Sequence, residues 1–394
     1  MHIDIPAGSD FTLANLPFGI FSTAGTSPRA GIAIGESILD LAALASTGCF
    51  DFDASVLSRP VLNDFIALGK PVTNGARAQV RSWVQEGPSP IRPEHLVPMQ
   101  EARLHLPIRI GDYTDFYSSI EHATNVGRMF RDPDNALLPN WRHLPVGYHG
   151  RASSIVVSGE PIRRPCGQLL PQDVQTPVFQ PTERLDFELE MAFVIGRDSK
   201  LGTPVPVAEA EDYIFGLALF NDWSARDIQK WEYVPLGPFL GKSFASSMAP
   251  WIVPLEALQP FRLPGPVQQP RPLEYLRDPD SYRSPANYDV ALTAAINDRI
   301  VSRSNTRHLY WSMPQQIAHH TSNGCNLRVG DLMASGTISG PDAGSYGSLL
   351  ELTQNGTTGK FLQDGDTVTL SAHAGEGAAR VGFGQVSGRI EPAQ

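Results

Sequence analysis

Short apolar stretches that alternate with polar residues recur along this 394-residue chain, and turn-forming Gly, Pro, Asn and Asp residues separate them. A period of two residues is typical of strands that bury one face. Helical periodicity is rarer, and residues 306–321 are the best helix candidate. The spacing indicates a β-sandwich or rolled sheet rather than a parallel α/β core. The predicted strands of this larger part are 154–157, 187–195, 214–220, 290–296, 347–352, 367–372 and 380–390.

The N-terminal part of the chain predicts a compact unit of its own. Apolar stretches within residues 19–41, with a tight turn at 35–37, suggest strands and a hairpin. Two short helices are predicted at 61–68 and 76–85. A proline-rich connector from Gly87 to Pro93 then marks a candidate boundary.

One predicted strand carries three carboxylates on the same face. Asp186, Glu188 and Glu190 alternate with apolar residues that form the opposite face, namely Phe187, Leu189, Met191 and Phe193. Three neighbouring carboxylates repel one another unless their charge is offset. Bulk water over an exposed sheet edge can do this, and so can a hard cation with oxygen ligands. The strand alone leaves both interpretations open.

Three other segments are rich in groups that could do chemistry. Residues 112–125 combine an acid, a phenol and an imidazole, residues 140–154 are dense in aromatic and basic groups, and residues 221–243 follow an apolar strand. The chain contains no Gly-x-Ser-x-Gly elbow, His-Glu-x-x-His or dinucleotide fingerprint. Gly237 and Gly241 are four residues apart, one short of the phosphate-loop spacing, so a nucleotide site is rejected.

The acidic residues that remain favour a hard divalent cation. Carboxylates without a cysteine or histidine pair bind Ca2+ or Mg2+ in preference to zinc. An all-oxygen site suits a substrate that chelates through two oxygens, such as a β-diketone or a keto acid. The cation would polarise the carbonyl, and His122 could activate water. The candidate ligands are Asp115, Glu188, Glu190 and Asp222.

Charge and cysteine content narrow the class of protein. The formal net charge of -10 argues against nucleic acid or an anionic membrane surface as the main partner. No apolar run approaches membrane-spanning length. The 3 cysteines lie far apart, as in a protein with reduced thiols, and the first residues do not resemble a secretory signal. We therefore expect a cytoplasmic protein.

Several long motifs, in order and over nearly the whole chain, resemble the fumarylacetoacetate hydrolase family. They are Tyr117–Ser119, His122–Gly127, Leu138–Trp141, Pro145–Ser154, Leu185–Phe193, Asn221–Asp227, Trp231–Phe244 and Gly336–Pro341. The resemblance implies a mainly β (α+β) fold, with a small N-terminal SH3-like β-barrel domain at residues 1–105. A large C-terminal mixed β-sandwich roll would follow at residues 106–394 and carry the catalytic site. It also implies a homodimer.

The activity that the resemblance implies is a metal-dependent hydrolysis of a carbon–carbon bond. The substrate would be 4-fumarylacetoacetate and the products fumarate and acetoacetate, at the last step of tyrosine and phenylalanine catabolism. A related acylpyruvase or oxaloacetate decarboxylase with the same metal site is the alternative enzyme. A catalytically silent β-rich binding protein is the alternative outside enzymes, and it predicts that chelators change nothing.

The resemblance also implies roles for individual residues. The metal ligands would be Asp115, Glu188, Glu190 and Asp222, with a second Mg2+ near Lys242 and Ser246. His122 would be the general base, oriented by Glu351. The oxyanion and the departing carbanion would be stabilised by Arg226, Gln229 and Lys242. The substrate would be bound by Tyr117, Arg131, Tyr148, Gln229, Tyr233 and Thr337. Ser246 departs from the family pattern, which usually has Thr there, but the hydroxyl is kept.

Overall fold

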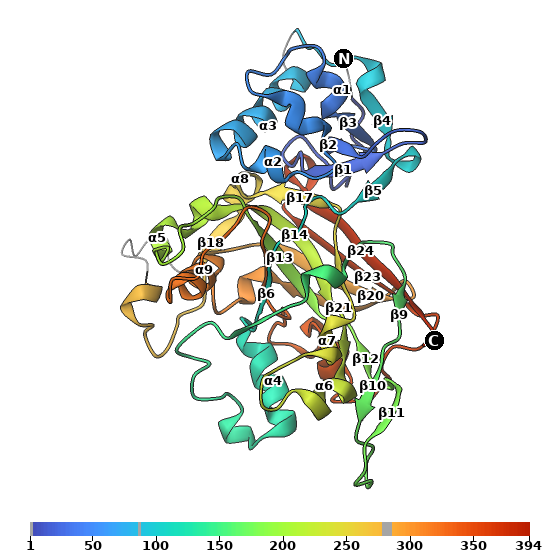
Figure 1. The fold of residues 1–394 in the computed structure, drawn as a ribbon, viewed down its shortest axis with the longest axis vertical. Coiled ribbons are helices and arrows are strands. Elements are labelled where there is room, and N and C mark those ends of the chain that lie inside the picture. The colour runs from blue at the N-terminus through green and yellow to red at the C-terminus, as the bar shows by residue number, and fades with distance from the viewer. Residues whose placement is uncertain (1–2, 86–87, 278–285) are drawn as a thin grey trace.

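The computed structural model of the chain describes residues 3–85, 88–277 and 286–394. Two sheets form the centre of the molecule, and short helices lie around them (Figure 1). Gly87, where the predicted connector begins, lies outside the described residues. Among the described helices, none is long and apolar enough to cross a membrane.

The larger sheet extends from the N-terminal unit through the middle of the molecule. Its N-terminal strands are β1 (Phe18–Ser22), β2 (Arg29–Ile34), β3 (Ser37–Asp40), β4 (Leu96–Pro98) and β5 (Arg103–His105). Its other strands are β6 (Tyr113–Phe116), β7 (Gly147–His149), β8 (Ile155–Val157), β13 (Leu189–Ile195), β14 (Ile214–Asp222), β16 (Ser246–Met248), β17 (Trp251–Pro254) and β22 (Leu332–Ala334). The main path is β4-β3-β2-β1-β17-β14-β13-β22-β6-β7.

A second sheet packs against one face of the first. It has the order β21-β20-β23-β24-β9. Its strands are β9 (Ile162–Arg163), β20 (Ala291–Ile296), β21 (Arg299–Asn305), β23 (Thr367–Ala374) and β24 (Val381–Glu391). Strands β23 and β24 lie against β14, and the core between the sheets includes Leu189, Met191 and Phe193 of β13. The predicted apolar face of this strand is therefore confirmed.

The N-terminal unit shares its hydrophobic core with the larger sheet. Phe18 and Ile32 belong to the same buried cluster as Ala192 and Val194 on the second face of β13. Strand β1 pairs with β2 on one edge and with β17 and β5 on the other. The SH3-like β-barrel is therefore not found among the described residues. The strands form an open sheet because their apolar side is covered by the rest of the chain.

Most predicted elements have counterparts in the structure. The larger-part strands predicted at 154–157, 187–195, 214–220, 290–296, 367–372 and 380–390 correspond to β8, β13, β14, β20, β23 and β24. The helices are α1 (Leu41–Ala45), α2 (Asn63–Ile66), α3 (Lys70–Gln85), α4 (Ile120–Phe130), α5 (Val207–Ala210), α6 (Arg226–Glu232), α7 (Leu240–Ser243), α8 (Leu255–Leu258), α9 (Met313–Thr321) and α10 (Leu349–Leu352). The small sheets pair β10 (Cys166–Leu169) with β11 (Val178–Pro181), β12 (Leu185–Asp186) with β15 (Ser224–Ala225), and β18 (Arg262–Pro264) with β19 (Ala286–Tyr288).

Two predictions fail because local capping outweighs hydrophobic periodicity. The strand predicted at 347–352 is the helix α10, whose N-cap Ser348 accepts a hydrogen bond from the Glu351 N–H. The helix predicted from residue 306 has its α-helical part only from Met313, because Ser312 and Gln315 form a capping box there. Residues 306–308 form a separate 3-10 turn.

Candidate functional site

Four buried carboxylates meet beside the interior strands β6, β13 and β14 of the larger sheet. Asp115 lies on β6, Glu190 on β13 and Asp222 at the end of β14, while Glu188 precedes β13 by one residue. One oxygen atom from each of the four lies within 4.8 Å of the others. All four side chains are buried, with Glu190 at 0% exposure. The exposed sheet edge that the acidic pattern left open is therefore excluded.

Strand register explains why these residues meet. Strand β22 pairs with both β13 and β6, and it places Ala334 opposite both Ala192 and Asp115. Glu190, two residues before Ala192, therefore projects from the same face near Asp115. On the outer side, Tyr148 of β7 is the cross-strand partner of Asp115, and Ser246 of β16 that of Asp222.

The cluster holds more negative charge than its cations offset. Burial raises the pKa of Asp115 and Glu190 well above the usual carboxyl range, and neighbouring carboxylates raise it further. Burial also raises the pKa of Asp222, although the positive charge of Lys242 opposes this shift. The folded chain thus keeps carboxylates where their ionised forms repel one another.

Two basic side chains reach into the cluster. Lys242 Nζ lies 2.5 Å from Glu188 Oε2 and 2.8 Å from Asp222 Oδ2. Arg226 Nη2 lies 2.7 Å from Glu188 Oε1. Burial acts to raise the pKa of Glu188, but Lys242 and Arg226 outweigh it and lower that pKa below its ordinary value. Glu188 is therefore the most firmly ionised of the four.

The donor set fits a divalent cation. Asp115 Oδ1 and Glu190 Oε1 are buried and have no hydrogen-bond partner. Orphaned carboxylate oxygens are costly in a protein interior unless a cation or a proton satisfies them. Because all four side chains offer oxygen, the cluster can hold a hard metal ion.

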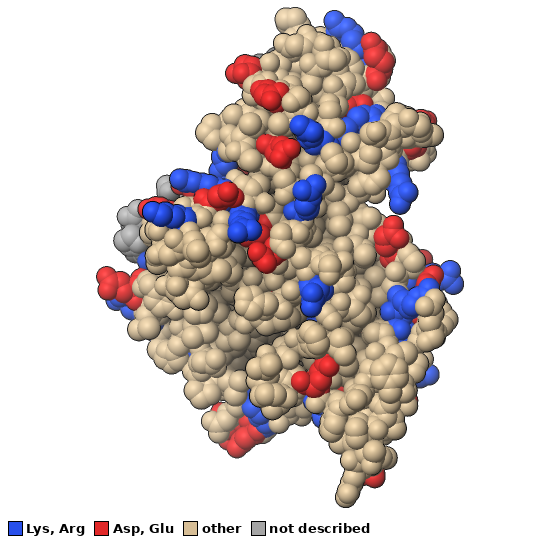
Figure 2. Space-filling model, in the orientation of Figure 1, with Lys and Arg blue, Asp and Glu red and all other residues tan. Residues whose placement is uncertain are grey.

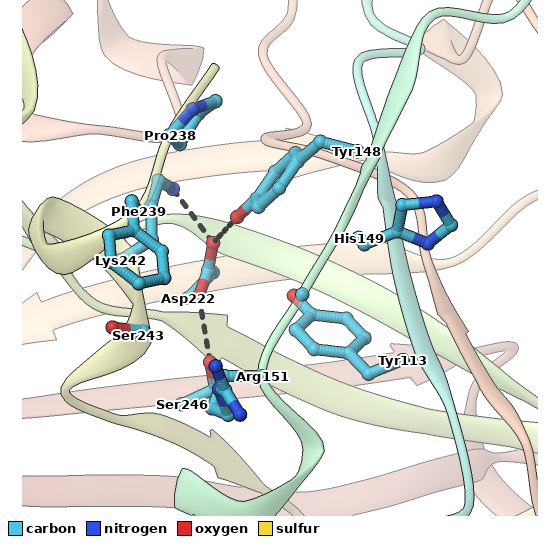
Figure 3. A pocket seen from close by; sticks show the side chains of 11 residues that line it. Tyr113, Tyr148, His149, Arg151, Asp222, Pro238, Phe239, Lys242, Ser243 and Ser246 are labelled. Atoms are coloured by element: carbon cyan, nitrogen blue, oxygen red, sulfur yellow. Dashed lines mark hydrogen bonds and ion pairs between the residues drawn. The ribbon is translucent and has the colours of Figure 1, made fainter. Parts of the chain in front are cut away.

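A pocket of about 60 Å³ opens beside Asp222 (Figure 3). Tyr148 and Lys242 both point at Asp222 from the pocket wall, and the Tyr148 hydroxyl donates to Asp222 Oδ2 at 3.1 Å. Ser246 Oγ donates to Asp222 Oδ1 at 2.7 Å. Tyr148, predicted as a substrate contact, and Lys242 and Ser246, predicted beside a second Mg2+, therefore all contact Asp222.

The predicted His–Glu pair is formed. Helix α4 carries His122, and its Nδ1 lies 2.6 Å from Oε2 of Glu351 on α10. Asn125 and Ser339 donate to the same carboxylate at 2.9 and 2.8 Å. Burial acts to raise the pKa of Glu351, but His122 and these hydrogen bonds lower it. An ionised Glu351 fixes the orientation of the imidazole.

The predicted substrate-binding residues are only partly assembled. The Tyr117 ring stacks edge-on against His122 with centroids 5.2 Å apart, and Thr337 is buried with its hydroxyl unpaired. Gln229 Oε1 accepts a hydrogen bond from Arg226 at 3.4 Å. Arg131 and Tyr233 are exposed. No hydrogen bond or ion pair within the described ranges joins either of these two side chains to the carboxylates.

Some groups around the site were missed by sequence reasoning. Asp186 is not among the predicted ligands, and its contacts with Arg226 and α10 were not foreseen. Ser339 and Ser348, which both donate to Glu351, were also missed. The Ser348-x-x-Glu351 spacing is a helix-start signature and could have revealed the second of them.

The fold and site together define a class of protein. A buried acidic cluster that could hold a metal ion, together with an oriented histidine, is compatible with an enzyme that hydrolyses a small molecule. Two family models match the chain. Fumarylacetoacetate hydrolase C-terminal matches residues 113–391, and Fumarylacetoacetase N-terminal matches residues 14–107. The chain belongs to the fumarylacetoacetate hydrolase family.

Curated relatives match over the full length. The chain is 49% identical to fumarylacetoacetase of Homo sapiens over 412 residues, covering 99% of this chain and 98% of the relative. It is 50% identical to that of Caenorhabditis elegans over 416 residues, covering 99% of each. The relative from Arabidopsis thaliana is 48% identical over 415 residues, covering 99% of this chain and 98% of the relative.

Solved structures share the fold at lower identity. A fumarylacetoacetate hydrolase from Exiguobacterium antarcticum has a TM-score of 0.59 and 19% identity, covering 96% of this chain and 100% of that one. A maleylpyruvate hydrolase from Sphingobium has a TM-score of 0.55 and 17% identity, with the same coverage. These two similarities support the fold alone.

Proposed function

We propose that this protein hydrolyses 4-fumarylacetoacetate to fumarate and acetoacetate. The observation that carries the proposal is the buried cluster of Asp115, Glu188, Glu190 and Asp222 beside the His122–Glu351 pair. Full-length similarity to proteins named fumarylacetoacetase supports this choice of substrate.

The histidine is arranged to act as a base. Ionised Glu351 accepts the hydrogen bond from Nδ1 of His122, which leaves Nε2 as the proton acceptor. His122 then takes a proton from water as the water attacks the substrate carbonyl. Because Glu351 carries negative charge, it stabilises the imidazolium that forms.

Hydrogen-bond donors, two of them positively charged, are proposed to meet the charge that develops during cleavage. A carbon leaving group departs as an enolate, so fixed donors are needed at that point. Arg226, Lys242 and Gln229 are proposed to serve this role. The proposed substrate contacts are Tyr117, Arg131, Tyr148, Gln229, Tyr233 and Thr337.

The acidic cluster is proposed to hold Ca2+ or Mg2+. Asp115, Glu188, Glu190 and Asp222 would hold the first ion, and Lys242 and Ser246 would lie beside a second Mg2+. When bound, a divalent cation supplies Lewis-acid polarisation of a carbonyl oxygen. The two unpaired oxygens of Asp115 and Glu190 support this assignment.

The direct test is an assay of substrate choice and metal dependence. Loss of fumarylacetoacetate absorbance is measured beside hydrolysis of an acylpyruvate and decarboxylation of oxaloacetate. Activity on the first that EDTA abolishes, and that Ca2+ or Mg2+ restores, supports the proposal. Activity only on the other two substrates would sink it.

Domain division, oligomeric state and cellular compartment are also proposals. We propose that residues 1–105 and 106–394 are two domains that share one sheet and part of a core, the second a β-sandwich roll. The two family matches and the two packed sheets support this division. A cytoplasmic homodimer is proposed, and the free thiols of Cys49, Cys166 and Cys325 are consistent with that compartment. On the face in Figure 2, basic and acidic side chains of the described residues are interspersed without a continuous basic surface, which supports a small-molecule partner.

A further inference from the structure

Asp186 lies behind the carboxylate cluster and is fully engaged by the protein. It is 0% exposed. Its Oδ1 accepts from the N–H groups of Phe187 at 2.8 Å and Leu349 at 2.7 Å. Its Oδ2 accepts from the Leu350 N–H at 3.0 Å and from Arg226 Nε at 2.8 Å. Four donors therefore leave this carboxylate no capacity for a metal ion.

One of these contacts sets the position of Arg226. The guanidinium is held at two of its nitrogen atoms, by a hydrogen bond from Nε to Asp186 and by an ion pair between Nη2 and Glu188. A planar guanidinium held at two atoms cannot rotate without weakening one of these charge-assisted contacts. Its side chain is 9% exposed, so water offers little replacement.

Two other contacts set the position of α10. The N–H groups of Leu349 and Leu350 belong to the first turn of this helix, where no intrahelical acceptor exists. Asp186 supplies that acceptor. The next residue, Glu351, holds Nδ1 of His122 at 2.6 Å. Movement of this turn would therefore move the partner of the histidine.

We propose that Asp186 is a positioning residue that holds Arg226 and the Glu351–His122 pair in a fixed relation to each other. The inference rests on the proposed function, in which Arg226 meets the developing enolate and His122 activates water. Both groups must act on the same bound substrate, so the distance between them matters as much as their chemical identity. Asp186 accepts hydrogen bonds both from Arg226 and from the first turn of α10, which carries Glu351.

The test replaces Asp186 with asparagine. Asp186→Asn keeps one acceptor oxygen and removes the negative charge. Where its amide N–H2 takes the place of Oδ2, Arg226 Nε and the Leu350 N–H lose their acceptor. The expected result is a kcat about 10²-fold lower, as for the loss of one preorganised charge-stabilising donor, with KM changed only a few-fold. The matched control is Asp331→Asn. Asp331 is also buried and accepts N–H groups of Asp112 and Arg328, so its variant should keep the wild-type kcat.

A double-mutant cycle separates positioning from general destabilisation. If Asp186 acts through Arg226, then Asp186→Asn combined with Arg226→Lys lowers kcat little more than the worse single variant. Calorimetric affinity for Ca2+ should stay within a few-fold of wild type, because all four carboxylates remain. Additive losses in kcat, a wild-type kcat in Asp186→Asn, or a folded variant that no longer binds Ca2+ would each overturn the inference.

A second measurement does not depend on the folding of the Asp186 variant. In Arg226→Ala, the vacated space faces Asp186 and Glu188, so added guanidinium ion should restore part of kcat. Methylammonium, which cannot bridge two carboxylates in a plane, should restore less. Equal rescue by both ions, or none by guanidinium, overturns the inference. A wild-type protein that is inactive on fumarylacetoacetate instead refutes the proposed function.

Discussion

His122 Nδ1 and Glu351 Oε2 lie 2.6 Å apart, and both side chains are buried. Asn125, Ser339 and Ser348 add three further donors to the Glu351 carboxylate. This carboxylate is therefore held in one orientation and kept ionised. The imidazole is in turn held in one orientation, because its Nδ1 has one strongly preferred partner.

Loss of the Glu351 charge should impair turnover. Glu351→Gln replaces a carboxylate that accepts four hydrogen bonds by an amide with one acceptor oxygen, so the imidazole loses its orienting partner. We expect kcat to fall by roughly 10²- to 10⁴-fold, the range of general base catalysis. Glu121→Gln, on the same helix and beside His122, is the control and should keep its kcat. Steady-state rates checked against circular dichroism decide the matter, and a near-normal kcat in folded Glu351→Gln would refute the orienting role.

Metal binding should stabilise the fold through Asp115. With Ca2+ or Mg2+ at 100 times its dissociation constant, the free energy of unfolding should rise by about 2.7 kcal/mol above that of the EDTA-treated protein. Asp115→Asn should lose most of this rise, because it removes one ligand charge. Asp331→Asn should retain it. Thermal unfolding with and without metal measures the difference, and equal rises in both variants would place the ion elsewhere.

The stability of the metal-free protein should depend on pH through Glu190. Burial raises the pKa of Glu190 in the folded state above its value in the unfolded chain. Below the unfolded pKa both states are protonated, and the contribution to stability is complete. As pH rises toward the folded pKa, the unfolded chain releases its proton first, so stability falls by up to ~1.4 kcal/mol per pH unit for this proton.

Glu190→Gln removes that titration and isolates its effect. The free energy of unfolding of the variant should exceed that of the metal-free wild type by a margin that grows as pH rises from about 4 to about 7. This range starts near the carboxyl pKa of the unfolded chain. Urea unfolding at several pH values provides the measurement. A stability difference that does not grow with pH would show that Glu190 titrates normally.

Stability and activity should depend on a hydroxyl group at position 246 more than on whether Ser or Thr supplies it. Ser246→Ala removes the donor to Asp222 Oδ1, and leaving that buried oxygen unpaired costs about 1–3 kcal/mol. Ser246→Thr keeps the donor and should retain activity within a few-fold. Chemical denaturation and a Mg2+ titration of activity compare the two variants. If Ser246→Thr is as impaired as Ser246→Ala, steric fit rather than the hydrogen bond governs this position.

Local pattern was sufficient for the strands that bury one face. The alternation of Phe187, Leu189, Met191 and Phe193 predicted a core-facing surface, and all four belong to the core between the two sheets. It was insufficient at residues 347–352, where the Ser348 cap starts a helix within an apolar run. It also could not show that the N-terminal strands complete their core against Ala192 and Val194.

The sequence by itself determined the types of chemical group available: oxygen ligands without cysteine, a histidine, and buried-strand periodicity around Glu188 and Glu190. Motif resemblance then grouped these residues into one predicted site. Only the tertiary structure decided that the acids are buried and converge within 4.8 Å. It also showed that Asp186 is occupied by protein donors while Glu188 belongs to the carboxylate cluster, although both lie on the same predicted strand face. The physical reason is that burial and hydrogen-bond partners come from distant segments, such as the first turn of α10, which periodicity along one strand cannot specify.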